Sequence, residues 1–395
     1  MILSSIDSGQ ARMTQEMIYL DNAATSWPKP NCVTEAITDA ITRCGGNPGR
    51  GGHRLALAAG ELFYEAREHT AAFFGSEDPF RVSFTLNITM AVNLVLKGFL
   101  SPADHVLISP MEHNAVMRPL TALGIPYNIL PSDANGKINL SEIQSQINST
   151  TKLIIICHES NVNGITQPIR EIGCIAHENK IAMLTDCAQS AGHIPINIES
   201  DNIDFLCFTG HKGLLGPTGT GGVIFGSRVD VEQIHPLLQG GTGSLSESFD
   251  QPGFLPDRFE SGTQNVCGLA GLNAGLKWIE NQGLETISRK GQELMNQLRS
   301  GLETIPGIHV YSGEGQVLSL TIDNLDNGTV AAELEERWGI MSRIGLHCSP
   351  LAHKTLGTFP NGTIRFAVSP FTTKQDIETC IKACGTLAEE AWTKK

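Results

Sequence analysis

Short apolar runs alternate with stretches of helical periodicity through the middle of the chain. The runs are six or seven residues long and are typical of buried strands: 81–86, 105–110, 127–132, 152–157, 181–186, 204–210 and 221–226. Helical stretches such as Ile169 to Lys180 lie between several of them. Strands that alternate with helices predict an α/β fold with a mostly parallel seven-stranded sheet and helices on both faces. Ligands bind such sheets at the carboxyl ends of the strands, so we expect the reactive residues directly after these runs.

The pattern changes beyond residue 230. Residues 230–262 are rich in Gly, Pro and Ser, which predicts a long irregular segment of a functional or connecting kind. Two helical stretches follow, at 264–282 and 284–303, then strand-like runs near 308–312, 317–322, 340–344 and 363–368, and a helix from about residue 374. We therefore expect a large domain at 18–262 and a smaller α+β domain made of 1–17 and 263–395.

The charge balance excludes several classes of partner. The 395 residues include 41 acidic and 28 basic residues, a net charge of −13, which argues against nonspecific binding to nucleic acid and to anionic membranes. Uninterrupted apolar runs are too short for a spanning helix, and residues 1–17 do not resemble a secretory signal. The ten cysteines form no CxxC pair, so we expect reduced thiols and a cytoplasmic protein.

Two charged residues follow neighbouring strands. Lys212 stands in the segment Phe208 to Gly213, where its amine could form a Schiff base with an aldehyde cofactor or remain a solvated loop lysine. Asp186 ends the run 181–186, where it could pair with a protonated pyridine nitrogen or cap a helix. Because Asp186 lies one strand earlier, a parallel sheet can bring both residues to the same edge.

Three polar residues follow other strands. Thr89 begins a helical stretch, where it could bind a phosphate group or serve only as a cap. His113 could stack on a flat cofactor ring or shuttle protons, although a lone histidine is more often structural. Asn161 could hydrogen-bond a ring hydroxyl.

The predicted small domain holds a cation and a thiol of interest. Arg365 lies in a strand-like run, where it could clamp a substrate carboxylate or form a structural salt bridge. Cys348 follows a glycine-containing loop beside His347, a setting that suits a nucleophilic thiol, although most cysteines are inert. A metal site of His347, Cys348 and His353 matches no common zinc spacing, so we expect no metal.

Taken together, these segments resemble the class V, fold-type I enzymes that use pyridoxal phosphate (PLP), within the cysteine desulfurase group. The resemblance covers nearly the whole chain, and many short matches in the right order make it specific. They are Tyr19 to Ser26, Asn47 to Arg54, Glu112 and His113, His158 to Gly164, Asp186 to Gln189, Thr209 to Lys212, Arg258 to Thr263, Gly345 to Cys348, and Arg365.

The resemblance implies a role for each matching residue. Lys212 looks like the Schiff-base lysine and later proton-transfer base, and Cys348 like the nucleophile that takes up the substrate sulfur. The implied cofactor contacts are Asp186 (pyridine nitrogen), Gln189 (phenolic oxygen), His113 (ring stacking), Asn161, Thr89, Thr209 and His211 (phosphate), and Thr263 (phosphate, from the other subunit of a homodimer). The implied substrate contacts are Arg365 for the carboxylate, Asn161 and Ala23.

The implied reaction converts L-cysteine to L-alanine and leaves a persulfide on Cys348 for an acceptor protein. Arg365 follows Cys348 by only 17 residues, which resembles the short cysteine loop of group II desulfurases and selenocysteine lyase-like members. Ile88, Met90 and Leu346 depart from residues that relatives commonly carry. The resemblance therefore assigns no phosphate contact to Ile88, no contact across the dimer to Met90 and no acid near Cys348 to Leu346.

Other functions stay open at this stage. The same site suits a selenocysteine lyase or another class V PLP enzyme, such as an aminotransferase, epimerase or lyase, although an aminotransferase needs no thiol at Cys348. A catalytically weak subunit that binds a sulfur-assembly partner is a further alternative. The acceptor is also open between an iron–sulfur scaffold, a tRNA-thiolation protein and a selenium pathway.

Overall fold

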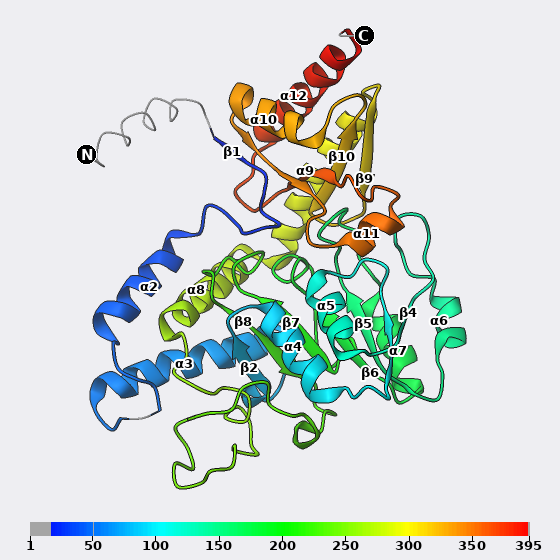
Figure 1. The fold of residues 1–395 in the computed structure, drawn as a ribbon. Helices are drawn as coiled ribbons and strands as arrows, with labels where there is room; N and C mark the ends of the chain where they lie inside the picture. Colours follow the sequence, from blue (N-terminus) through cyan, green and yellow to red (C-terminus); the bar gives the residue numbers. More distant parts are fainter. Residues whose placement is uncertain (1–16, 50, 394–395) are drawn as a thin grey trace, which may run out of the picture.

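The computed structural model describes residues 17–49 and 51–393 (Figure 1), so nearly all of the predicted segment 1–17 lies outside the described residues. The described residues form a seven-stranded sheet in the order β2-β8-β7-β6-β5-β3-β4. Only β8 runs antiparallel to its neighbours, so the mostly parallel sheet is confirmed. Each predicted run contains one strand: β2 (Val82–Thr85), β3 (His105–Ile108), β4 (Tyr127–Ile129), β5 (Thr151–Cys157), β6 (Ala182–Asp186), β7 (Phe205–Thr209) and β8 (Gly221–Phe225).

Helices cover both faces of this sheet. One face carries α3 (Arg54–Phe73), α6 (Leu140–Gln146), α7 (Ile169–Glu178) and α8 (Val266–Gln282), and the other carries α4 (Ile88–Phe99) and α5 (Asn114–Leu123). Along β5, Ile154 and Ile156 pack on the first face while Leu153 and Ile155 pack on the second. The strands are continuous apolar runs because both of their faces are buried.

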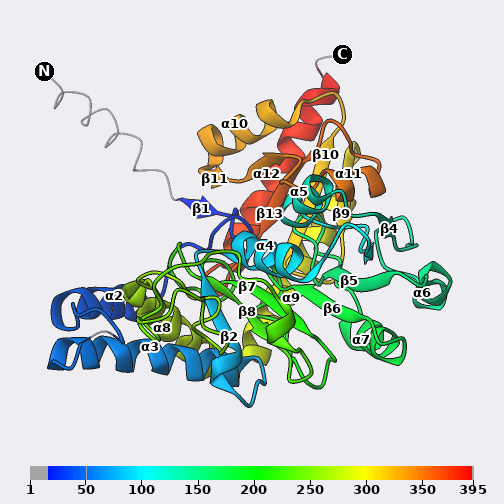
Figure 2. The same ribbon diagram turned by 60° about the horizontal axis from the view of Figure 1, so that its bottom comes forward.

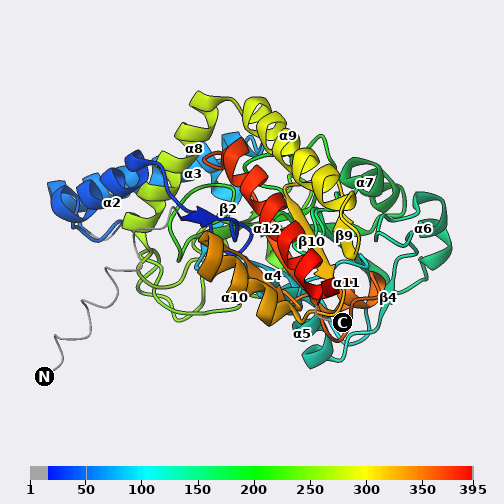
Figure 3. The ribbon, with the colours of Figure 1, turned by 90° about the horizontal axis from the view of Figure 1, so that it is seen from above.

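A four-stranded antiparallel sheet forms the core of the small domain, in the order β12 (Arg343–Gly345), β13 (Thr363–Ala367), β10 (Val317–Ile322), β9 (Ile308–Ser312). Its apolar cluster includes residues of α9 (Leu284–Glu303), α10 (Asn327–Trp338) and α12 (Lys374–Thr393). Seen from above, α9 and α12 lie side by side (Figure 3). The expected small α+β unit is therefore present, and α11 (Pro350–Thr355) lies between it and the large sheet (Figure 1).

The packing differs from the expected domain division at both ends. β1 (Ile18–Tyr19) pairs with β11 (Ile340–Met341), and Ile18 and Leu20 join the apolar cluster of the small sheet (Figure 2). Conversely, α8 packs its buried face against the large sheet and against α2 (Asn31–Arg43). Apolar contacts decide both placements, and neither is visible in the local sequence pattern.

Between β8 and α8 the described chain is irregular, as predicted, apart from one 3₁₀ turn, η2 (Val231–Gln233). A second such turn, η1 (Pro79–Arg81), precedes β2. Glu260 ties the irregular segment to α3, through a 2.7 Å pair with the buried Arg67, and to β2, by accepting from the Phe84 N–H at 2.7 Å. No helix in the described part of the chain is long and apolar enough to cross a membrane.

Candidate active site

The carboxyl ends of the large sheet place polar residues along the edge that faces the small domain. Asp186 is the last residue of β6 and Thr209 the last of β7. His113 follows β3, Asn161 follows β5 and Thr89 follows β2. Five strands thus bring together residues that are up to 120 positions apart in the sequence.

Lys212 lies in a tight loop after β7. A Cβ atom on Gly210 or Gly213 would approach neighbouring atoms to 2.1 and 2.3 Å, so only glycine fits this close packing. Burial, followed by the charge of the nearby Arg365, lowers the pKa of the Lys212 amine to about 8, while Asp186 opposes the shift. The amine is therefore far easier to deprotonate than an ordinary lysine, as a Schiff-base nucleophile requires.

The backbone at Lys212 is braced by residues to which sequence reasoning assigned no role. Ser26 donates its hydroxyl to the Lys212 carbonyl at 2.8 Å. The His211 carbonyl accepts from the Lys29 amine at 2.8 Å and from the Ser26 backbone N–H at 3.0 Å. Ser26 belongs to a segment that carried the resemblance, which was the only signal for it.

Asp186 is buried at the end of β6. Burial raises the pKa of its carboxyl, while the Ala188 N–H, at 2.9 Å, and the charge of Lys212 oppose the rise. Asp186 caps no helix, because α7 precedes it and the residues after it form turns. The carboxylate is therefore placed to interact with a cation at the carboxyl end of the strand.

His113 caps α5 and also faces the site. Its Nδ1 accepts from the Ala115 N–H at 3.0 Å, so the neutral ring carries its proton on Nε2. Burial, followed by the charge of Lys212, lowers the pKa of His113 to about 4. The cap shows that His113 has a structural role, and a neutral imidazole ring of this kind also suits stacking on a flat cofactor.

The predicted phosphate ligands fall into two groups. Thr89 is exposed in the first turn of α4, and His211 has a buried Nδ1 without a hydrogen-bond partner among the described residues. Thr209 is buried and bonds the Thr220 carbonyl at 3.4 Å. Ile88 packs in the core. Thr263 lies apart, exposed in the irregular segment, where the described structure gives it a hydrogen bond to Asn47.

Arg365 forms the salt bridge that was one of its two predicted alternatives. Its Nη2 pairs with Asp21 at 2.9 Å, and its Nη1 donates to the Asn161 carbonyl at 3.0 Å. Its buried Nε has no partner in the described part of the chain. One donor of a buried guanidinium thus stays open for an anionic oxygen, and the salt bridge to Asp21 was missed because the two residues are 344 positions apart.

Cys348 is an exposed free thiol between β12 and α11. It lines a groove of about 400 Å³ together with Thr89, His113 and Asn114. The Asn114 N–H donates to the Cys348 carbonyl at 2.8 Å. Cys348 therefore shares this groove with two of the predicted cofactor residues, Thr89 and His113.

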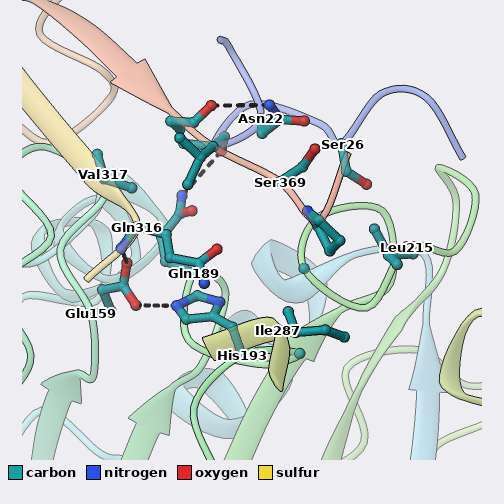
Figure 4. Close-up of a pocket in the computed structure, with 16 residues that line it drawn as sticks. Asn22, Ser26, Glu159, Gln189, His193, Leu215, Ile287, Gln316, Val317 and Ser369 are labelled. Atoms are coloured by element: carbon teal, nitrogen blue, oxygen red, sulfur yellow. Dashed lines mark hydrogen bonds and ion pairs between the residues drawn. The ribbon is translucent and has the colours of Figure 1, made fainter. Parts of the chain in front are cut away.

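Gln189 and Ala23 meet on another side of the site, where Gln189 Nε2 donates to the Ala23 carbonyl at 3.1 Å. Both line a cavity of about 30 Å³ between the domains, room for roughly one water molecule (Figure 4). Glu159 lies at its wall, bonded to His193 at 2.6 Å and to the Gln316 N–H at 3.0 Å. This buried carboxylate joins the two domains and was not predicted.

The residues present fit PLP. Lys212 supplies an amine of lowered pKa, Asp186 a buried carboxylate, and His113 a neutral ring. The unpartnered Nδ1 of His211 suits a phosphate oxygen. These groups match an aldehyde, a pyridine nitrogen, an aromatic ring and a phosphate.

Comparison with known proteins agrees with this chemistry. Residues 18–380 match the family model for aminotransferase class-V. A probable cysteine desulfurase from Methanothermobacter thermautotrophicus is 34% identical over 379 residues, which cover 93% of each chain. Another from Halalkalibacterium halodurans is 33% identical, covering 93% of this chain and 92% of the relative.

Solved structures give the same result. The apo cysteine desulfurase of Thermococcus onnurineus superposes with a TM-score of 0.88 and 32% identity, covering 95% of each chain. The S-sulfonic acid form of an Escherichia coli cysteine desulfurase gives a TM-score of 0.84 and 27% identity, covering 97% of this chain and 98% of the other. The chain therefore belongs to the aminotransferase class-V family, whose members use PLP, and within it to the cysteine desulfurases.

Proposed function

We propose that this protein is a PLP-dependent cysteine desulfurase that converts L-cysteine to L-alanine and holds the sulfur as a persulfide on Cys348. The observation that carries the proposal is the place of that thiol. It is exposed on the groove that also holds His113 and Thr89, and its loop contacts Asn161 beside Arg365.

Arg365 binds the substrate carboxylate in this proposal. Its open Nε–H supplies a donor, and its pairing with Asp21 fixes the direction of the guanidinium. Because Arg365 and Lys212 are close enough for the first to lower the pKa of the second, a carboxylate on Arg365 brings the substrate α-carbon toward the lysine amine.

Lys212 removes the α-proton and carries it within the site. When bound, PLP supplies an electron sink for the pair left on the α-carbon. Lys212 would link covalently to that cofactor, and Asp186 would pair with its pyridine nitrogen. His113 would cover the ring, while Thr89, Thr209 and His211 would hold the phosphate.

Cys348 accepts the sulfur. Its thiolate attacks the substrate sulfur, an S–S bond forms, and the bond between sulfur and the β-carbon breaks with its electron pair remaining on carbon. Protonation of that carbon fragment and its release give L-alanine. The outer sulfur of the persulfide then passes to an acceptor thiol.

The biological setting is also part of the proposal. We infer a cytoplasmic homodimer in which Thr263 reaches the phosphate of the other subunit, because Thr263 is exposed in the irregular segment. We expect a sulfur-acceptor protein, with iron–sulfur cluster assembly as one destination. Selenocysteine lyase activity is the second candidate, because an exposed thiol at Cys348 can accept selenium as well as sulfur.

The test measures alanine and sulfide released from L-cysteine, with a thiol reductant present to free the persulfide sulfur, by the PLP-loaded wild type and by Cys348→Ala. Equimolar products from the wild type, lost in the variant, support the desulfurase. A PLP-loaded wild type that releases no alanine from L-cysteine overturns it, and alanine from L-selenocysteine alone would instead establish the lyase.

A further inference from the structure

The backbone around Cys348 adopts an unfavourable conformation. His347 and Cys348 are consecutive residues with positive φ angles, 48° and 60°. Residues other than glycine rarely adopt this left-handed region, because the Cβ atom clashes with the backbone. Two such residues in succession persist only where surrounding contacts hold them. The nucleophile of the proposed reaction is therefore held in place by specific contacts.

Three hydrogen bonds from the large domain hold it. The Asn161 Nδ2 donates to the His347 carbonyl at 2.6 Å, and the Ser349 hydroxyl donates to the Asn161 Oδ1 at 2.7 Å. The Asn114 N–H donates to the Cys348 carbonyl at 2.8 Å. His347, Ser349 and Asn161 are all buried, so water does not compete for the first two bonds.

The partners fix the orientation of the Asn161 amide. A carbonyl can only accept, so the nitrogen must face His347, and the oxygen then faces the Ser349 hydroxyl. Both polar ends of this side chain are committed to the cysteine loop, one on each side of Cys348. That use differs from the cofactor and substrate contact expected from the sequence.

The same residue is joined to the proposed substrate clamp. The Asn161 backbone carbonyl accepts from Arg365 Nη1 at 3.0 Å. Arg365 is itself held by Asp21, and it lies on β13 beside the strand that leads into the cysteine loop. Hydrogen bonds through Asn161 therefore connect the Arg365 guanidinium to the residues on both sides of Cys348, His347 and Ser349.

We propose that Asn161 and Ser349 are positioning residues that hold the Cys348 thiol in register with a substrate bound at Arg365. The inference rests on the proposed function for its chemistry, but the pinning of the loop is a property of the polypeptide alone. Ser349 provides the second of the two hydrogen bonds between the Asn161 side chain and the cysteine loop, and its hydroxyl contacts no other predicted site residue in the described structure.

The test compares Ser349→Ala with Ser319→Ala in the full chain. Ser319 is an equally buried serine whose hydroxyl also crosses between the domains, to the Val162 carbonyl at 2.6 Å, one residue from Asn161. It does not touch the cysteine loop. The first measurement is amide hydrogen exchange of residues 343–352 in the apoenzyme, which needs no activity.

For Ser349→Ala we expect the amide exchange rate of residues 343–352 to rise about fivefold, because the net stabilisation of one hydrogen bond is lost. In the PLP-loaded enzyme, single-turnover persulfide formation on Cys348 should fall by a similar factor while the KM for L-cysteine stays unchanged. Ser319→Ala should alter neither. Asn161→Ala, read only by exchange in the apoenzyme, should exceed Ser349→Ala because it loses two bonds.

The proposal is overturned if Ser349→Ala shows the same amide exchange and the same rate of persulfide formation as the wild type. It is also overturned if Ser319→Ala has an equal effect, because that would indicate a general loosening of the contact between the domains. A change confined to the KM for L-cysteine also contradicts the proposal, because the two bonds of Asn161 act on the thiol of Cys348 and not on the carboxylate site at Arg365. Failure of the wild type to release alanine would defeat the proposed function and leave the exchange result to decide the pinning.

Discussion

The amine of Lys212 determines how the apoenzyme takes up its cofactor. Only the neutral amine attacks an aldehyde, and burial lowers its pKa to about 8. Below that pH the neutral fraction grows about tenfold per unit, and above it the fraction saturates. We predict that the rate at which added PLP turns the apoenzyme yellow rises from about pH 6 to 8 and levels off near pH 9.

The direction of this profile distinguishes Lys212 from an ordinary lysine, whose rate would keep rising to about pH 10. Such a continued rise would contradict the prediction. Lys212→Ala should abolish the lasting yellow colour, while the exposed Lys374→Ala should reproduce the wild-type profile.

Asp186 provides the second prediction at the residue scale. In Asp186→Asn the amide oxygen can still accept from the Ala188 N–H, so the fold is kept while the buried negative charge is lost. We predict that alanine release falls about 10²–10³-fold, the size typical of removing one preorganised electrostatic contact. Stopped-flow kinetics of the loaded enzyme measure this, with circular dichroism as the check on folding.

Asp204→Asn is the matched control. Asp204 is also a buried aspartate that accepts from a backbone N–H, that of Met183 at 2.8 Å, but it precedes β7 and lies at the opposite edge of the sheet. Its loss should reduce stability and leave kcat within about twofold. An equal loss of activity in both variants would refute a specific role for Asp186.

At the scale of elements, the large sheet was predictable because its signal is local. Both faces of each central strand are buried, so each strand is a continuous apolar run, and parallel strands bring Asp186 and Lys212 to one edge. Contacts distant in sequence were not predictable. Asp21 meets Arg365 across 344 residues, and Ser349 meets Asn161 across 188. β1 is only two residues long and gains its place by pairing with β11.

The link between α3 and the irregular segment gives a prediction at this scale. Arg67 is 2% exposed, pairs with Glu260 at 2.7 Å, and lies over the rings of Phe63 and Phe84. Arg67→Met leaves a buried carboxylate without its cation, which typically costs about 3–5 kcal/mol. We predict a loss of that size in the free energy of unfolding, measured by urea denaturation.

A double variant tests the cause of that loss. The Phe84 N–H donates to the Glu260 carboxylate at 2.7 Å. Glu260→Gln retains an acceptor for this N–H but removes the negative charge. Adding Glu260→Gln to Arg67→Met should therefore recover part of the lost stability. If the double variant is less stable than Arg67→Met alone, the stranded charge is not the cause.

At the scale of the whole molecule, residues 159–164 of the large domain form a segment that contacts the small domain through hydrogen bonds. Glu159 accepts from the Gln316 N–H, Val162 from the Ser319 hydroxyl, and the Asn163 carbonyl from the Gly313 N–H at 2.6 Å. The segment that positions Asn161 for the cysteine loop thus also fixes the domain that carries Cys348 and Arg365. The residues proposed to bind the substrate carboxylate, to take up its sulfur and to hold the cofactor are consequently fixed relative to one another within a single chain.

Thr263 is the exception, because it lies apart from the other predicted phosphate ligands, exposed in the irregular segment. If it serves the other subunit of a homodimer, the site of each chain is completed by its partner. We predict that co-expressed Lys212→Ala and Thr263→Asp chains regain activity, although each alone is inactive. Thr263→Asp places a carboxylate against the phosphate, and like charges repel.

The expected recovery follows from counting sites. In a mixed dimer, one site carries both substitutions and the other carries neither, so a purified heterodimer should show about half of the wild-type activity. Alanine release by the doubly tagged, purified heterodimer measures it, and the separately purified homodimers are the controls. If Thr263 instead served its own chain, both sites of the mixed dimer would carry one substitution, and the absence of recovery would place Thr263 outside the partner's site.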